Sequence, residues 1–186
     1  MTLPSLHREL AIASQAEAEV LVRERPGYWH VISIREPFHP EPVLDGALSV
    51  FPSIFEDVLN GQGQHGHGPR TAHLEGILKV ASLRSRVPLL VHCWAGRSRS
   101  TAVALALIVK ELWDSGEDGP RLVTAAVNRL LALRPLAVPN ALVLRLALQL
   151  IVPPPLPLTL AQSLLNEPRL AANRAAFHFD PSDQAP

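Results

Sequence analysis

The sequence of 186 residues has one cysteine, no excess of either charge and no long apolar run. The single thiol, Cys93, excludes an intramolecular disulfide and fits a reducing compartment. Because 17 lysines and arginines balance 17 aspartates and glutamates, nothing supports a nucleic-acid surface, which usually shows a basic patch. The most apolar run, residues 102–109, is too short to span a bilayer, and residues 1–10 lack the apolar stretch of a secretory signal. We therefore expect a cytoplasmic protein with neither a nucleic-acid partner nor a membrane partner.

The sequence does contain enough apolar material for one ordinary domain. Hydrophobic residues make up 47% of the chain, and a chain of this length can bury a core without disulfides or a metal. Strand-like and helix-like segments alternate, which predicts an α/β fold with a mostly parallel central sheet flanked by helices. The expected strands cover residues 8–13, 29–35, 47–51 and 87–91, and the expected helices cover 14–25, 69–81, 98–113, 120–133 and 139–151.

The spacing of hydrophobic residues supports several of these elements. Leu74, Ile77 and Leu78 follow the i, i+3, i+4 pattern of a helix with one buried face. Residues 87–91 form a short apolar run, as in a strand that is covered on both faces. Residues 98–113 are apolar nearly all round, which predicts a helix buried in the centre of the domain.

The composition changes after residue 151. Residues 153–158, Pro-Pro-Pro-Leu-Pro-Leu, predict a stiff and extended spacer, and residues 159–176 predict one amphipathic helix. We therefore expect one domain over residues 1–151, followed by a Pro-rich linker and helical extension over residues 152–186. The sequence leaves open whether this extension packs on the domain or mediates association.

Residues 92–100, His-Cys-Trp-Ala-Gly-Arg-Ser-Arg-Ser, carry the strongest chemical signal. Arg99 stands six positions after Cys93, and Ser100 follows at once. The segment leaves an apolar strand and opens a buried helix, an arrangement that turns backbone N–H groups toward an anion. Gly96 in the middle lets the backbone fold tightly enough to wrap a phosphate.

Each residue type in this segment has a chemical reason to be there. A helix N-terminus and a neighbouring arginine favour the thiolate of Cys93, which makes it a nucleophile. Arg99 can offer a planar fork to two phosphate oxygens, and Ser100 can donate a hydrogen bond to the sulfur when it leaves. His92 is expected to point back into the structure and to fix the loop through hydrogen bonds. The residues expected to bind the phosphate are Trp94, Ala95, Gly96, Arg97, Ser98 and Arg99.

The non-catalytic alternative is that Cys93 is a buried structural cysteine, which is the common state of a free cysteine. The arginine, serine and glycine at these spacings speak against that interpretation.

Residues 92–100 resemble the active-site loop of the cysteine-dependent protein tyrosine phosphatases, HC-x5-R-[ST]. The chain is most similar to the compact dual-specificity branch and to small bacterial relatives, and the similarity runs over residues 29–150. Residues 134–140, Arg-Pro-Leu-Ala-Val-Pro-Asn, add support, because a similar segment follows the core helices of dual-specificity enzymes. The resemblance implies the compact fold of that branch, a cysteinyl-phosphate intermediate, no metal or other cofactor, and an aspartate general acid upstream of the cysteine.

Asp57, with Glu56 beside it, is the best candidate for this acid. The small bacterial relatives carry an aspartate followed by an aliphatic residue at about this place, as Asp57 and Val58 do. The alternative is a solvated loop carboxylate, because residues 52–68 as a whole predict a loop. Pro52 and Phe55 also make the segment longer or differently bent than the family pattern.

His65 and His67 could suggest a metal site. Two histidines do not complete a ligand set, however, and no acidic or cysteine partner lies close to them in the sequence. We expect a flexible polar loop near the rim of the site instead.

Together these features predict a phosphatase for phosphate monoesters, most of all phosphotyrosine, with a phosphorylated protein or a small phosphomonoester as substrate. A catalytically inactive phosphate-binding module stays open as an alternative. So does a phosphatase for a phosphoinositide or an RNA 5′-phosphate, although the loop lacks the lysine typical of phosphoinositide phosphatases and the neutral charge argues against RNA. A rhodanese-like sulfur carrier would not need Arg99 and Ser100.

Overall fold

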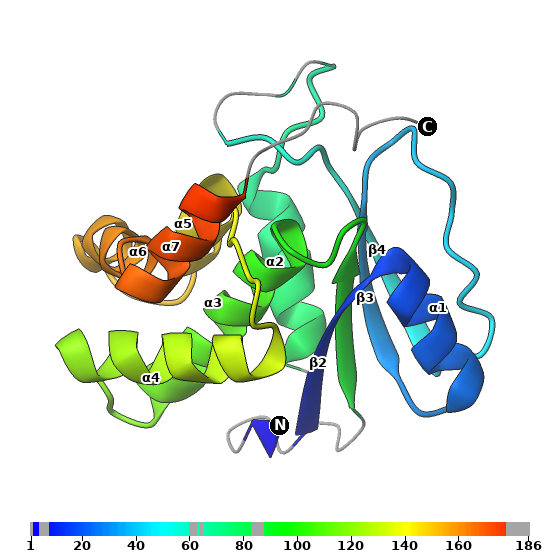
Figure 1. The fold of residues 1–186 in the computed structure, drawn as a ribbon, viewed down its shortest axis with the longest axis horizontal. Coiled ribbons are helices and arrows are strands. Elements are labelled where there is room, and N and C mark those ends of the chain that lie inside the picture. Colours follow the sequence, from blue (N-terminus) through cyan, green and yellow to red (C-terminus); the bar gives the residue numbers. More distant parts are fainter. Residues whose placement is uncertain (1, 4–7, 60–62, 64, 83–87, 178–186) are drawn as a thin grey trace.

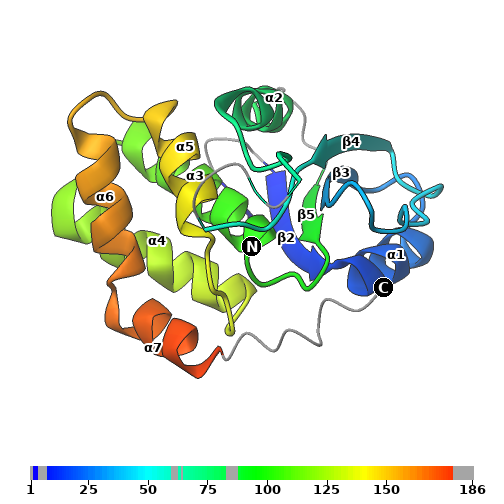
Figure 2. The same ribbon diagram turned by 90° about the horizontal axis from the view of Figure 1, so that it is seen from above.

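The computed structural model describes residues 2–3, 8–59, 63, 65–82 and 88–177. Within these residues the chain forms one sheet from β1 (Thr2–Leu3), β2 (Arg8–Ser14), β3 (His30–Arg35), β4 (Ser49–Ile54) and β5 (Leu89–Cys93). The strand order is β1-β2-β5-β3-β4, with β1 antiparallel and the other strands parallel (Figures 1 and 2). The predicted α/β fold with a mostly parallel sheet is confirmed.

Helices cover both faces of this sheet. They are α1 (Gln15–Glu24), α2 (Thr71–Ala81), α3 (Arg99–Asp114), α4 (Gly119–Leu133), α5 (Ala141–Gln149), α6 (Leu156–Leu165) and α7 (Pro168–Ala176). Figure 2 shows α1 on one side of the sheet and α2 to α7 on the other. The hydrophobic core is divided in the same way, because the residues of α1 pack in a smaller cluster and those of α2 to α7 in a larger one.

The central strand β5 divides its side chains between these two clusters. Leu89, Val91 and Cys93 belong to the larger cluster, and Leu90 belongs to the smaller one. This alternation follows from the two-residue period of a strand, and it explains why residues on both faces of β5 are apolar. The helix that follows, α3, is buried over most of its length, as its all-round apolar sequence predicts. The chain therefore leaves β5 at Cys93 and re-enters the core directly with α3.

The structure differs from the sequence-based prediction at β4. A strand was expected over residues 47–51 and a loop from Pro52, but β4 continues through Pro52 to Ile54. β4 lies at the edge of the sheet, where a proline is tolerated because no further strand needs its missing N–H. The longer strand carries the chain closer to the carboxyl end of the sheet before the loop with Asp57 begins.

The C-terminal extension also differs from the prediction. The Pro-rich residues 153–158 do not form an extended spacer, since α6 begins at Leu156 and has Pro157 in its first turn, a position that suits proline. The predicted single helix over residues 159–176 is two helices, and Pro168 begins the second. Leu164 and Leu170 are buried in the larger core cluster, so the described part of the extension packs on the domain. Residues 178–186 lie outside the described residues.

Among the helices of the described residues, none is both long and apolar enough to cross a lipid bilayer.

Candidate active site

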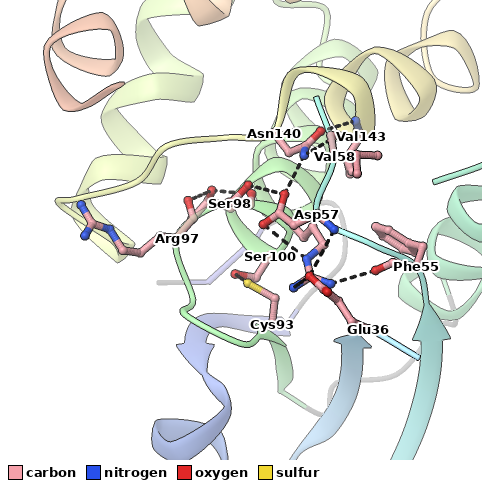
Figure 3. A network of polar contacts seen from close by, with 12 residues as sticks. Glu36, Phe55, Asp57, Val58, Cys93, Arg97, Ser98, Ser100, Asn140 and Val143 are labelled. Atoms are coloured by element: carbon pink, nitrogen blue, oxygen red, sulfur yellow. Dashed lines mark hydrogen bonds and ion pairs between the residues drawn. The ribbon is translucent and has the colours of Figure 1, made fainter. Parts of the chain in front are cut away.

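Cys93 stands at the carboxyl end of the central strand. It pairs with Ser14 of β2 in the sheet register and is buried. Its Sγ lies 3.1 Å from the Oγ of Ser100, in the first turn of α3 (Figure 3). The hydroxyl can therefore donate to the sulfur, as the sequence predicts for a thiolate that must leave.

The loop between Cys93 and α3 is shaped by Gly96. This glycine has φ +66°, and a Cβ added to it would lie 2.4 Å from the backbone nitrogen of Ser14. Any other residue would clash with the end of β2, so the tight loop requires glycine here. None of the backbone N–H groups of residues 94–98 donates a hydrogen bond to another described residue. The loop thus carries backbone donors at the N-terminus of a helix, where an anion is favoured.

Arg99 is 2% exposed although it carries a full charge. Its Nη1 donates to the carbonyl of Phe55 at 2.8 Å, and its Nη2 lies 3.2 Å from Oε1 of Glu36. Its Nε lies 3.4 Å from Oδ2 of Asp57, which is an ion pair but not a hydrogen bond. Among the described residues, this buried Nε–H has no hydrogen-bond partner. Arg99 is thus held through Nη1 and Nη2, and its Nε–H remains as a donor for a ligand.

Asp57 lies on the loop that follows β4, and the structure brings it next to the cysteine loop. Its Oδ1 accepts hydrogen bonds from Oγ of Ser98 at 2.8 Å and from Nδ2 of Asn140 at 2.7 Å (Figure 3). Two donors therefore fix one oxygen of the carboxylate, while Oδ2 faces Arg99. Phe55, expected to alter this segment, is buried and supplies the carbonyl that binds Arg99.

Asn140 connects three parts of the site, a role that the sequence analysis does not assign. Its Oδ1 caps α5 by accepting from the N–H groups of Leu142 and Val143. Its Nδ2 donates to Asp57 and to the carbonyl of Val58. The rest of residues 134–140 also braces the cysteine loop, with Val138 N donating to Arg97 O at 2.8 Å. The sequence signal was the N-cap position of an asparagine ahead of a helix.

Glu36 is the second residue that sequence reasoning missed. It follows β3 directly, and β3 is the neighbour of β5 in the sheet. One carboxylate oxygen, Oε1, contacts Arg99 Nη2 and also accepts from the backbone N–H of Asp57 at 3.3 Å. An acidic residue at the carboxyl end of a parallel strand was the available signal, because ligand sites gather at that edge.

Comparison with known proteins identifies the fold. No family model matches the chain, and no curated protein matches it. Among solved structures, human DUSP28 is 22% identical, with a TM-score of 0.51 over 90% of this chain and 95% of that chain. A mouse protein assigned as a dual-specificity phosphatase, solved with zinc tungstate, is 22% identical, with a TM-score of 0.50 over 89% of this chain and 87% of that chain. The chain has the fold of the dual-specificity phosphatases.

Within this dual-specificity phosphatase fold, the ring of His92 is buried, as predicted. That it fixes the loop through hydrogen bonds stays a prediction. Burial lowers the pKa of His92 to about 4, because a charged imidazole would lose its hydration there. His92 therefore contributes as a neutral packed ring at neutral pH.

This buried histidine predicts a loss of stability in mild acid. The ordinary pKa of 6.5 applies to the unfolded chain, and the folded value is about 4. Between these pH values the unfolded chain binds a proton that the folded chain does not, so stability is full above pH 6.5 and falls as the pH drops toward 4. The gap corresponds to at most about 3 kcal/mol. Urea unfolding at pH 7 and at pH 4.5 measures it.

The matched variant for this measurement is His92→Leu, which cannot titrate. We expect it to lose clearly less unfolding free energy than the wild type over the same pH interval. Equal losses in the two proteins would show that other groups cause the acid sensitivity.

Two further loop residues have side chains that turn outward. Trp94 is partly exposed and packs on the ring of His39, with 4.6 Å between the ring centroids. Arg97 extends away from Cys93 and from Asp57 (Figure 3). Ala95 is exposed. The backbone of these residues forms the loop, whereas their side chains lie at its rim.

His65 has an acidic partner in space, contrary to the expectation from the sequence. Its Nδ1 lies 2.8 Å from Oε1 of the buried Glu56, and its backbone N–H also contacts that oxygen. The contact with His65 lowers the pKa of Glu56. Across the described residues no group of three or more histidine, cysteine, aspartate or glutamate side chains could hold a metal ion. His65 therefore fastens its own loop to the residue beside Asp57.

Proposed function

We propose that this chain is a phosphatase that hydrolyses phosphate monoesters, most of all phosphotyrosine in proteins, through a cysteinyl-phosphate intermediate. The observation that carries this proposal is the Nε–H of Arg99, which is buried, lacks a hydrogen-bond partner among the described residues and lies beside Asp57. Together with the backbone donors of the loop above Cys93, it offers positive potential where a phosphate would sit. A structural cysteine would need none of these groups.

In the first step the thiolate of Cys93 attacks phosphorus, so that the S–P bond forms and the bond from phosphorus to the ester oxygen breaks. The leaving oxygen takes a proton from Oδ2 of Asp57. The hydrogen bonds from Ser98 and Asn140 to Oδ1 leave Oδ2 as the oxygen that carries this proton. A bound phosphate would replace Asp57 as the partner of Arg99, which leaves Oδ2 to face the leaving oxygen.

In the second step Asp57, now ionised, takes a proton from water while the water oxygen attacks phosphorus. The S–P bond breaks, inorganic phosphate leaves, and the thiolate of Cys93 is restored. Ser100 lies within 3.1 Å of the sulfur and can donate to it as the negative charge returns. The roles of acid and base thus fall on one carboxylate in successive steps.

The apolar rim supports an aryl phosphate as the preferred substrate. Phe38, Leu59, Trp94 and Leu136 are large exposed apolar residues, and they stand on the same loops as Glu36, Asp57, Cys93 and Asn140. An aromatic ring bound over the loop would cover part of this surface, which favours binding. A phosphopeptide series with phosphotyrosine, phosphothreonine and phosphoserine in one sequence measures the preference, and equal rates for the three would contradict it.

The replacement Asp57→Asn tests the proposal, with leaving groups of different basicity. In the presence of a chelator the wild type should hydrolyse both p-nitrophenyl phosphate and phenyl phosphate. Asp57→Asn should lower kcat for phenyl phosphate by roughly 10²-fold or more, because its basic leaving oxygen needs the proton. The loss for p-nitrophenyl phosphate should be smaller, because p-nitrophenolate leaves without a proton.

The control for this test is Asp114→Asn, which removes a carboxylate of the Lys110 ion pair at the far end of α3. It should leave both rates unchanged. Absence of any hydrolysis by the wild type would favour the inactive phosphate-binding module. Equal losses for the two substrates would remove Asp57 as the acid while leaving the nucleophile in place.

A further inference from the structure

Arg97 is a basic residue in the middle of the phosphate loop, yet its side chain does not face the pocket. Figure 3 shows it extending away from Cys93. Its guanidinium carbon lies 4.6 Å from the ring centroid of Phe177, within the range of a cation–π contact. Its Nε also donates to the carbonyl of Leu136 at 3.4 Å. Two contacts from outside the loop therefore hold Arg97 in this outward position.

The two groups that contact Arg97, the ring of Phe177 and the carbonyl of Leu136, are linked through α7. Asn173 in this helix donates from Nδ2 to the carbonyls of Pro135 and Ala137, at 2.8 and 3.0 Å. Leu170, one turn earlier, is buried in the main core. Phe177 thus follows a helix that is fixed to the same residues 134–138 that brace the loop. The C-terminal extension contacts the phosphate loop through this aromatic ring.

The outward position of Arg97 keeps its charge away from Cys93. Arg99 is paired with the carboxylates of Glu36 and Asp57, and Arg134, which contacts the loop at Ala95, is paired with Glu17. A second anionic group on the substrate would lie near the carboxylates of Glu36 and Asp57, and the charge of Arg97 would be turned away from it. We propose that Phe177 and α7 keep Arg97 turned away from the pocket. The site is thereby selective for phosphate esters that carry no second negative charge next to the phosphate. This inference rests on the proposed function, because it assumes that the loop binds a phosphate ester.

The test measures peptide binding in the Cys93→Ser background, so that it does not depend on turnover. One phosphotyrosine peptide has neutral residues beside the phosphotyrosine, and the other has aspartate and glutamate there. The background protein should prefer the neutral peptide. Adding Phe177→Ala should improve the affinity for the acidic peptide about threefold relative to the neutral one, because Arg97 is then free to turn inward. This gain should shrink at high ionic strength.

Two further variants separate this explanation from a general loosening of the site. Adding Arg97→Ala to Phe177→Ala should abolish the gain, because the cation that causes it is gone. Leu158→Ala, which removes an exposed apolar residue of α6, should leave the ratio of the two affinities unchanged.

An unchanged ratio in Phe177→Ala, or a gain that survives without Arg97, would overturn the inference while the phosphatase proposal stands. Failure of both peptides to bind would overturn both. Peptide binding with the expected ratios, but without hydrolysis by the wild type, would leave this inference intact and refute the proposed phosphatase.

Discussion

Replacing Cys93 with serine should abolish hydrolysis of phosphate esters while leaving the fold and the binding of phosphate in place. A serine hydroxyl ionises far less readily than a thiol and has no general base beside it, since the neighbouring group is the hydroxyl of Ser100. Loss of the nucleophile should lower kcat by on the order of 10⁴-fold or more. Arg99 and the backbone donors of residues 94–98 do not depend on the sulfur, so a phosphate ester should still bind.

The measurement combines a rate with a binding constant. The rate of p-nitrophenyl phosphate hydrolysis measures the loss of the nucleophile. Titration of the inactive variant with a phosphotyrosine peptide, which it does not hydrolyse, measures the affinity of the pocket. Cys93→Ala serves as the comparison, because a purely structural cysteine would tolerate alanine and serine with activity retained. Substantial turnover by either variant would refute the cysteinyl-phosphate intermediate.

The sequence predicts the centre of the fold because the signals there are local. The apolar run before Cys93 and the all-round apolar character of residues 98–113 specify a buried strand followed by a buried helix. The full length of β4 is harder to predict from the sequence, because its continuation through Pro52 depends on pairing with β3 at the sheet edge. Tertiary pairing of this kind overrides the local preference of proline for a turn.

In the C-terminal extension, too, a tertiary contact overrides the local preference of proline. Three consecutive prolines predict an extended chain when they are considered alone. In the structure α6 begins directly after these prolines, and burial of Leu164 in the core stabilises it. The sequence contains the apolar residues of this contact, but it does not say which surface they meet.

Some residues of the candidate site lie in one short segment of the sequence, and others are brought to it by the fold. Cys93, Arg99 and Ser100 lie within eight positions, so their spacing and chemistry suffice to identify them. Glu36 and Asn140 come from distant segments, and only the sheet order and the N-cap of α5 bring them to Arg99 and Asp57. A long-range contact made by a single polar residue leaves no periodic pattern in the sequence.

Glu36 changes the physical picture of the site. Two carboxylates, each about one quarter exposed, pair with one buried guanidinium. They fix the guanidinium plane, and they also reduce the net positive charge that a phosphate meets. Recognition must therefore depend on directed hydrogen bonds from a planar group more than on charge alone.

This conclusion gives the second large prediction, which concerns Arg99→Lys. Nη1 and Nη2 of the guanidinium contact Phe55 and Glu36, while its Nε–H lies beside Asp57 without a hydrogen bond and remains for phosphate. One ammonium group on a flexible stem cannot reproduce this fork, so kcat/KM should fall by roughly 10²- to 10³-fold. The charge is kept, so the loss of unfolding free energy should stay below that of Arg99→Ala. The alanine variant leaves the two carboxylates facing each other and should cost about 2 kcal/mol, reduced from a fully buried pair by their exposure.

Arg129→Lys is the matched control, because Arg129 also pairs with a buried carboxylate, Glu111, but lies on α4 away from the loop. Steady-state kinetics and urea unfolding of the three variants separate the two roles of Arg99. If charge alone bound the phosphate, Arg99→Lys would retain most of its kcat/KM and resemble Arg129→Lys. If Arg99 acted only as a structural ion pair, the loss of activity would follow the loss of stability, with the alanine variant affected and the lysine variant nearly normal. A large kinetic loss with a small loss of stability in Arg99→Lys is the result expected if the planar guanidinium binds the phosphate through directed hydrogen bonds.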